Sequence, residues 1–180
     1  MALLEIDQLR VEFPTREGLL TALDDISLKV EEGEVLGLVG ESGAGKSMTG
    51  SAVIGLLEPP GRIASGEIRF DGKRIDNLSY EDLRAVRGKH IGAIFQDPLT
   101  SLNPLYSIER QLVETITAHL DMTPREAKAR AVDLLTQVGI PAPQVRIEHF
   151  PHQFSGGMRQ RVVIALALAA EPRLLIADEP

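Results

Sequence analysis

The feature that most constrains this chain is a glycine-rich loop flanked by two different hydrophobic patterns. Residues 40–47 read G-E-S-G-A-G-K-S and match the pattern G-x-x-x-x-G-K-[ST]. An apolar strand pattern, V-L-G-L-V, precedes the loop, and a helix pattern, M-T-G-S-A-V-I-G-L-L, follows it. Strand, loop and helix in this order are the context in which the motif binds phosphate. The sequence therefore predicts a nucleotide site in an α/β fold.

The residue types in the loop suit a polyphosphate. Glycines at positions 40, 43 and 45 permit positive φ and close backbone approach, so successive N–H groups can line a nest at the positive end of the following helix. Lys46 can reach the β and γ phosphates, and the Ser47 hydroxyl can ligate Mg²⁺. A turn that merely connects two elements is the alternative, which the flanking patterns disfavour. The predicted nucleotide-binding residues are Gly40, Glu41, Ser42, Gly43, Ala44, Gly45, Lys46 and Ser47.

Composition narrows the class of protein. The chain has 180 residues, of which 43% are hydrophobic and 25% charged, as in ordinary globular domains. The formal charge of -7 disfavours a surface that neutralises a nucleic-acid backbone or anionic lipid, although a local basic groove stays compatible. Without cysteine, these residues can form no disulfide or thiolate metal site. The longest apolar run, residues 162–170, is too short to span a bilayer, so membrane association is expected only through another protein.

Hydrophobic periodicity predicts the elements around the loop. Leu9–Phe13 and Ile26–Val30 alternate apolar and polar residues, as half-buried antiparallel strands do. Residues 35–39 are continuously apolar and predict a buried parallel strand. A further alternating strand is expected over residues 66–72, a short helix after Ser79, and a strand over residues 90–95.

From about residue 97 to 155 the pattern becomes helical. Ile108, Leu112, Ile116 and Leu120 form an i, i+4 stripe, and residues 123–126, T-P-R-E, read as a capping box. The second helix is expected to run to Gly139, with Glu126 and Arg130 four residues apart on its surface. These stripes indicate core packing rather than chemistry.

Two acidic residues follow an apolar strand pattern near the end of the chain. Residues 174–179 read L-L-I-A-D-E and predict a buried strand whose carboxyl end presents both carboxylates, where parallel sheets place their ligands. Asp178 would help hold Mg²⁺ through water. Glu179 would orient or deprotonate the attacking water, because a metal ligand is a poor base. Taken alone, Asp178 and Glu179 would fit a solvent-exposed loop equally well. Their occurrence in one chain with the phosphate loop favours the ligand site.

A second glycine-rich helix start lies at residues 154–160, F-S-G-G-M-R-Q. Ser155 is an N-cap residue type, and two glycines leave bare N–H groups at the positive end of the helix. The predicted phosphate-binding surface comprises Ser155, Gly156, Gly157 and Met158. Because one nucleotide rarely needs two such surfaces, this one is expected to address the γ-phosphate held by another subunit. The alternative is an ordinary helix start with flexible glycines.

Together with F-Q-D-P at residues 95–98, these segments resemble the Walker A, Q-loop, signature and Walker B motifs of an ABC transporter ATPase subunit. More narrowly, F-Q-D-P-L-T-S-L-N-P-L and H-Q-F-S-G-G-M-R-Q-R resemble the dipeptide, oligopeptide and nickel importer group. The resemblance implies a P-loop NTPase with a RecA-like parallel-sheet core, an N-terminal antiparallel β layer and an inserted α-helical subdomain. Residues 1–96 and 158–180 would form the core and residues 97–157 the helical subdomain of one partial domain, incomplete at the C-terminus.

The resemblance also implies roles for single residues. Phe13 would stack on adenine, with a plain core position as the alternative. Gln96 would touch the Mg²⁺ and water shell and signal to a membrane subunit docked near residues 97–109; the alternative is a plain surface glutamine. The implied catalytic set is Glu179, Lys46 and Gln96, and the implied metal set is Ser47, Gln96 and Asp178.

The chain departs from the family pattern in two places. Met158 stands where the general signature has glutamine, and none of the four histidines matches the family's switch histidine. The chain stops at Pro180, before the D-loop, the switch histidine and further core strands. We therefore expect this segment to bind ATP and to hydrolyse it poorly.

The function implied is ATP- and Mg²⁺-dependent import of peptides or related small solutes through a membrane permease. The expected partners are a second ATPase subunit, preferably a sister, the integral membrane permease and, indirectly, a solute-binding protein, but no nucleic acid. The expected location is peripheral, at the cytoplasmic face of the inner membrane. A soluble ABC-type ATPase without a membrane partner and a non-hydrolysing fragment stay open as alternatives.

Overall fold

A computed structural model describes residues 2–179, without the side chains of Pro98 and Leu99. Pro180, the last residue of the predicted Walker B segment, lies outside the described residues. The chain divides into two compact units, Met1–Arg87 and Gly88–Pro180, and each is described by itself. The predicted division into a core of residues 1–96 and 158–180 and a helical subdomain of residues 97–157 stays a prediction.

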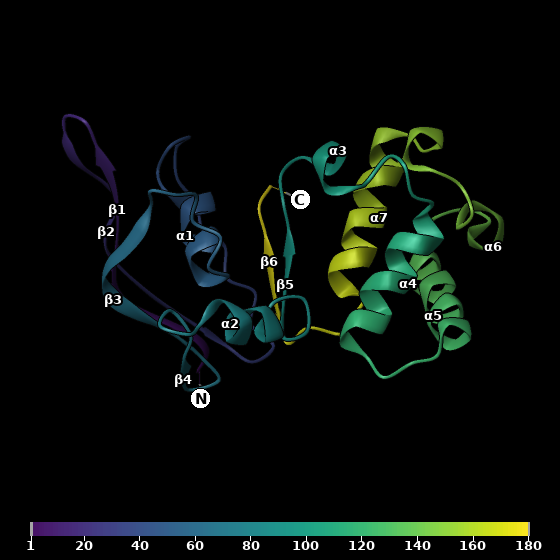
Figure 1. Cartoon of the computed structure of the whole chain (residues 1–180), viewed down its shortest axis with the longest axis horizontal. Helices are drawn as coiled ribbons and strands as arrows, with labels where there is room; N and C mark the ends of the chain where they lie inside the picture. Colours follow the sequence, from purple (N-terminus) through teal and green to yellow (C-terminus); the bar gives the residue numbers. More distant parts are fainter. Residues whose placement is uncertain (1, 180) are drawn as a thin grey trace. The chain divides into compact units, whose positions relative to one another are not determined.

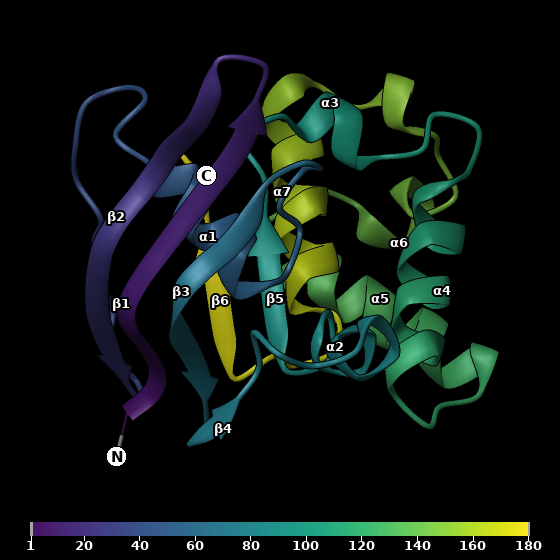
Figure 2. The ribbon, with the colours of Figure 1, turned by 60° about the vertical axis from the view of Figure 1, so that its left-hand side comes forward.

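The first unit is built on an antiparallel sheet with the strand order β2-β1-β3-β4 (Figures 1 and 2). Strands β1 and β2 form a long hairpin, β3 pairs with the other edge of β1, and the short β4 pairs with β3. This confirms the predicted N-terminal β layer. The elements of this unit are β1 (Ala2–Thr15), β2 (Gly18–Glu31), α1 (Lys46–Val53), β3 (Arg62–Phe70), β4 (Lys73–Arg74) and α2 (Tyr80–Val86).

A bulge in β1 decides which of its side chains enter the core. Ile6 and Leu9 are both buried although three residues apart, because the register with β2 and β3 shifts between them. At the bulge, Gln8 has a φ of 47° and the backbone bends toward Gly66. A Cβ on Gly66 would lie 2.4 Å from the Gln8 carbonyl oxygen and 2.6 Å from that of Asp7. Only glycine therefore allows β3 to approach the bulge this closely.

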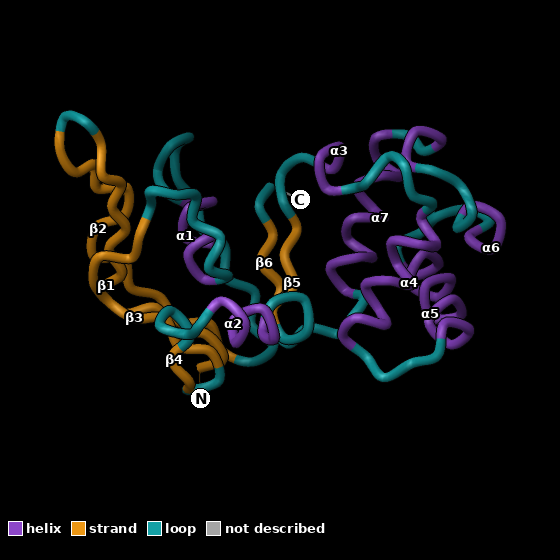
Figure 3. The backbone as a smooth tube through the Cα atoms, in the orientation of Figure 1, coloured by secondary structure: helices purple, strands orange, loops and turns teal. Residues whose placement is uncertain are grey.

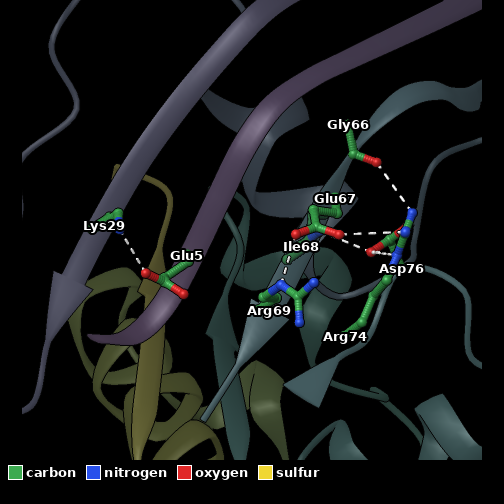
Figure 4. Close-up of polar contacts among 8 residues, drawn as sticks. All are labelled: Glu5, Lys29, Gly66, Glu67, Ile68, Arg69, Arg74 and Asp76. Atoms are coloured by element: carbon green, nitrogen blue, oxygen red, sulfur yellow. Dashed lines mark hydrogen bonds and ion pairs between the residues drawn. The ribbon is translucent and has the colours of Figure 1, made fainter. Parts of the chain in front are cut away.

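The other face of the sheet is covered by charged pairs (Figure 4). Lys29 Nζ lies 2.7 Å from Glu5 Oε1 across the hairpin. At β3, Asp76 Oδ1 accepts a hydrogen bond of 2.8 Å from the Ile68 N–H, and Arg74 Nη2 donates to Asp76 Oδ2 at 2.8 Å. The Asp76 side chain is only 5% exposed, so these bonds tie the segment after β4 to β3. Burial acts to raise the pKa of Asp76, but the hydrogen bonds from Arg74 and Ile68 and the attraction of Arg74 hold this pKa below its ordinary value.

Residues 35–39 do not form the predicted buried parallel strand. They belong to the long loop between β2 and α1 (Figure 3), and Val35 and Val39 are 97% and 99% exposed. The prediction is wrong because a strand needs a hydrogen-bonding neighbour, and among residues 2–179 no strand pairs with this segment. Apolar composition alone does not provide the neighbouring strand that the backbone hydrogen bonds need.

The second unit combines a parallel strand pair with a cluster of helices (Figures 1 and 2). Strands β5 and β6 pair in parallel from Ile91↔Leu174 to Ile94↔Ala177. The predicted strands are confirmed, but β6 is less buried than expected: Leu174 is buried, whereas Leu175 is 40% exposed. The elements are β5 (Ile91–Ile94), α3 (Pro98–Ser101), α4 (Ile108–His119), α5 (Pro124–Gln137), α6 (Pro143–Arg146), a 3₁₀ turn (Pro151–Gln153), α7 (Gly156–Leu168) and β6 (Leu174–Ala177).

The helices of the second unit enclose one hydrophobic core. The predicted stripe of α4 packs there, with Ile108, Leu112 and Ile116 fully buried. The capping box of α5 is also confirmed, because Thr123 and Glu126 bond each other's backbone N–H groups. A pairing of Glu126 with Arg130 is not found, because Glu126 is engaged in the box and Arg130 turns toward α7.

We predict that Gly66→Ala lowers the free energy of unfolding by about 1 to 3 kcal/mol, because a methyl group collides with two carbonyl oxygens in a strained backbone conformation. The matched control is Gly72→Ala, where φ is also positive but no atom lies within 4 Å of the added Cβ. Urea denaturation measures both variants. Equal decreases in the free energy of unfolding in the two variants would contradict the close approach of β3 to the bulge of β1.

We predict that Asp76→Asn costs about 1 to 3 kcal/mol at neutral pH, because a buried, hydrogen-bonded charge is lost. The folded-state pKa of Asp76 is lowered, so its contribution is present above the ordinary value of 3.8 and is lost as the pH falls through the folded-state pKa. Denaturation at pH 7 and pH 3 should therefore show a smaller difference between variant and wild type at pH 3. A difference that grows in acid would refute this role.

Candidate nucleotide-binding and catalytic site

The phosphate loop ends in a left-handed turn that starts α1. Gly45, the N-cap, has a φ of 88°, and Gly43 has a φ of 84°. Gly40 does not use a positive φ, but a Cβ there would meet Ala44 Cβ at 3.2 Å, so the backbone approach at this position is close. Gly45 is the most restricted of the three, because a Cβ there would lie 2.4 Å from Leu23 Cδ2 of β2. The loop therefore rests directly on the antiparallel sheet.

Lys46 closes the loop on itself. Its ammonium donates to the carbonyl oxygens of Gly40 and Glu41, each at 2.9 Å. A lysine ammonium has three donors, so two hold the loop and one is left for a ligand. Residues 40–44 are exposed, and no side chain caps the N-terminus of α1. Positive charge and uncapped amides at a helix N-terminus form an anion-binding arrangement.

The next residues fix the orientation of α1. Thr49 is buried and donates from Oγ1 to the Gly45 carbonyl oxygen at 3.0 Å, which anchors the first turn of the helix. Ser47 stays exposed at the same end. Its hydroxyl is therefore accessible to a ligand, as the motif predicts.

Phe13 is neither a core residue nor a free aromatic. It is half-buried in β1 opposite Leu20, and its ring covers the backbone of Gly61, where an added Cβ would lie 2.6 Å from Phe13 Cε1. The adenine-stacking role stays a prediction.

In the second unit, Gln96 and Glu179 lie together at the carboxyl ends of β5 and β6. Gln96 Nε2 donates to Glu179 Oε2 at 2.7 Å, and both side chains are exposed. The Asp178 N–H donates to the Ile94 carbonyl oxygen at 2.9 Å, which continues the parallel pairing by one residue. Sequence reasoning missed the Gln96–Glu179 bond. The sequence did contain a signal for it, because neighbouring parallel strands have their carboxyl ends at the same edge of the sheet.

The glycine-rich start of α7 has the predicted cap. Ser155 Oγ accepts a hydrogen bond of 3.3 Å from the Met158 N–H. Gly156 and Gly157 are exposed, and no atom lies within 4 Å of a Cβ built at either position. This end of α7 is therefore accessible to another molecule.

The predicted metal ligands suit Mg²⁺ by their chemistry. Ser47, Gln96 and Asp178 offer hydroxyl, amide and carboxylate oxygens, the hard donors that Mg²⁺ takes. Among the described residues no group of three His, Asp or Glu side chains could hold a metal alone.

Comparison with known proteins agrees with this geometry. The ABC transporter family model matches residues 23–180, and the chain belongs to this family, which implies nucleotide binding. The chain is 51% identical to the oligopeptide transport ATP-binding protein OppD of Bacillus subtilis (99% of this chain, 50% of OppD). It is 47% identical to the dipeptide transport ATP-binding protein DppD of Escherichia coli (100% of this chain, 55% of DppD). The chain thus spans about half the length of these relatives.

A solved structure has a similar fold. The ATP-binding cassette MJ0796, determined as a dimer in a post-hydrolysis state bound to ADP and Pi, matches with a TM-score of 0.86 and 28% identity. The match covers 97% of this chain and 73% of that one. This confirms the predicted fold class as the α/β fold of an ABC ATPase cassette.

We predict that Gly45→Ala weakens nucleotide binding by at least about tenfold, because the left-handed turn is strained for alanine and the new Cβ would displace the Leu23 side chain. The matched control is Gly43→Ala, which has the same sign of φ but no atom within 4 Å of the new Cβ. Titration with a fluorescent ATP analogue measures both. An unchanged affinity in Gly45→Ala would show that the loop conformation does not carry binding.

Proposed function

We propose that this protein is an ATP-binding subunit that couples ATP binding and hydrolysis to the import of peptides through a membrane permease. The observation that carries the proposal is the phosphate loop at residues 40–47 within a chain 47% to 51% identical to peptide-importer subunits. No helix among the described residues has the length and apolarity to cross a bilayer. Attachment at the cytoplasmic face of the inner membrane would therefore come through the permease.

The residues of the loop bind the polyphosphate. Amides at the start of α1 bond its oxygens, and the Lys46 ammonium exchanges its carbonyl acceptors for the β and γ phosphates. Glu41, Ser42 and Ala44 contribute backbone, and Phe13 stacks on the adenine. Ser47, Gln96 and Asp178 would hold Mg²⁺, which supplies charge neutralisation of the phosphates when bound.

Glu179 acts on the attacking water. Its carboxylate accepts a proton from the water and orients it, while Asp178 serves the metal. In the structure the Glu179 carboxylate is held by the Gln96 amide. Gln96 therefore positions the base before hydrolysis and is suited to report the state of the nucleotide to the permease docked near residues 97–109.

A second ATPase subunit completes each site. The exposed start of α7, residues 155–158, addresses the γ-phosphate bound by the partner, with the amides and Ser155 as donors because Met158 has no amide side chain. A sister subunit is the proposed partner, and a solute-binding protein delivers the peptide to the permease.

The test uses the full-length protein assembled with its permease and sister subunit in lipid nanodiscs. Peptide-stimulated ATP hydrolysis is expected, and Glu179→Gln should lower kcat by about a hundredfold or more while ATP still binds, since a general base contributes this much. The control is Glu81→Gln, which makes the same change of charge at an exposed position of α2. Hydrolysis that Glu179→Gln leaves intact would contradict the assigned base. Hydrolysis indifferent to permease and peptide would contradict the import function.

A further inference from the structure

Helices α5 and α7 lie side by side in the second unit (Figures 1 and 2) and are bonded to each other at both ends. Arg130, in the second turn of α5, reaches the end of α7, and Arg161, in the second turn of α7, reaches the segment after α5. The two helices are therefore antiparallel, and each supplies an arginine to the carboxyl end of the other. We call Arg130 and Arg161 the arginine clamp.

The Arg130 half of the clamp caps α7. Its Nε donates to the Ala169 carbonyl oxygen at 2.9 Å, and its Nη1 lies 2.9 Å from Glu171 Oε1. Ala169 is the C-cap of α7, where unsatisfied carbonyls and the negative end of the helix dipole favour a cation. The Arg130 side chain is only 19% exposed whereas Glu171 is 74% exposed, so the bond to Ala169 is the better shielded of the two.

The Arg161 half of the clamp caps α5. Its Nη1 donates to the Gly139 carbonyl oxygen at 2.9 Å. Gly139 has a φ of 74°, and the N–H of Ile140 returns to the Leu135 carbonyl oxygen at 2.9 Å, so the helix ends in a Schellman turn. The Gly139 carbonyl projects from a fixed turn, which makes it a firm anchor.

The arginine clamp fixes the position of the two helices along their axes, which the apolar contact between them does not. The residues that α5 and α7 bury in the common core are small or aliphatic, including Ala127 and Ala131 of α5 and Val162 and Ala165 of α7. Hydrophobic contact is non-directional, so it resists separation of the helices more than sliding along their axes. Two directed bonds at opposite ends fix the axial register.

Helix α7 connects two parts of the proposed site. Its first residues follow Ser155, and its end leads through residues 169–173 into β6, which carries Asp178 and Glu179. The Arg173 and Leu174 N–H groups both donate to the His90 carbonyl oxygen, so the start of β6 is tied to the segment before β5. A shift of α7 along α5 would move Ser155 and strain the entry into β6 together.

We propose that Arg130 and Arg161 are positioning residues for ATP hydrolysis, which hold α7 in the register that places Ser155 and Glu179 correctly. The inference rests on the proposed function. The hydrogen bonds of the two arginines go to Ala169, Glu171 and Gly139 rather than to Ser155 or Glu179, so the arginines act through the helix. The clamp is therefore expected to affect the chemical step rather than nucleotide affinity.

The test compares Arg130→Met and Arg161→Met with Arg125→Met, a control arginine exposed on the same helix α5. In the full-length assembled protein, each clamp variant should lower kcat about three- to tenfold and leave KM for ATP within about twofold, whereas the control should change neither. Arg161→Lys should recover most of the rate, because one donor is enough for the Gly139 carbonyl. Amide hydrogen exchange should become faster over residues 156–173 in both Met variants only.

The outcomes separate the clamp from the proposed function. If the wild type is active and the clamp variants keep its kcat, or lose only thermal stability, the inference is overturned. If the wild type binds no ATP or does not hydrolyse it, the proposed function fails, and hydrogen exchange alone decides whether the clamp fixes α7: unchanged exchange in both Met variants overturns it. Should a Met variant fail to fold, the corresponding Ala variant, which also lacks the donor, takes its place with the same criteria.

Discussion

The turn at Gly45 is the constraint on which the nucleotide site depends. Its left-handed backbone lies against Leu23 of the sheet, and Gly45 is the N-cap at which α1 begins without a capping side chain. Lys46 then bonds the carbonyls of Gly40 and Glu41 and places a positive charge beside the N-terminal amides of α1. The antiparallel sheet therefore matters for function, because it is the surface against which the phosphate loop is shaped.

In the second unit, strand pairing rather than a glycine turn places the groups proposed to take part in hydrolysis. Parallel pairing of β5 and β6 brings Gln96 and Glu179 within hydrogen-bond distance, although 83 residues separate them. Helix α7 connects the Ser155 cap to β6, and arginines bond it to α5 at both ends. In our proposal, side chains outside the site thus determine where Ser155 and Glu179 lie.

The sequence predicted best those features that depend on neighbours in the chain. The caps at Ser79, Thr123 and Ser155 were all predicted, because a cap is formed by residues three positions apart. The strand expected at residues 35–39 was wrong, because pairing depends on distant residues that apolar composition does not reveal. Arg130 was expected on the surface of its helix, and its bond to the Ala169 carbonyl oxygen was not predicted for the same reason, since Ala169 is 39 residues away. Motif order predicted a set of site residues, which stay predictions, and it did not predict the bond between Gln96 and Glu179.

We infer that this protein recognises its nucleotide chiefly through the polyphosphate. Calorimetry of the full-length protein with Mg²⁺ and either ATP or adenosine measures that preference. ATP is expected to bind at least about a hundredfold more tightly than adenosine, and Lys46→Ala is expected to reduce this ratio by about tenfold or more, because charge-assisted bonds to phosphate are lost. Equal affinities for ATP and adenosine in the wild-type protein would refute recognition through the polyphosphate.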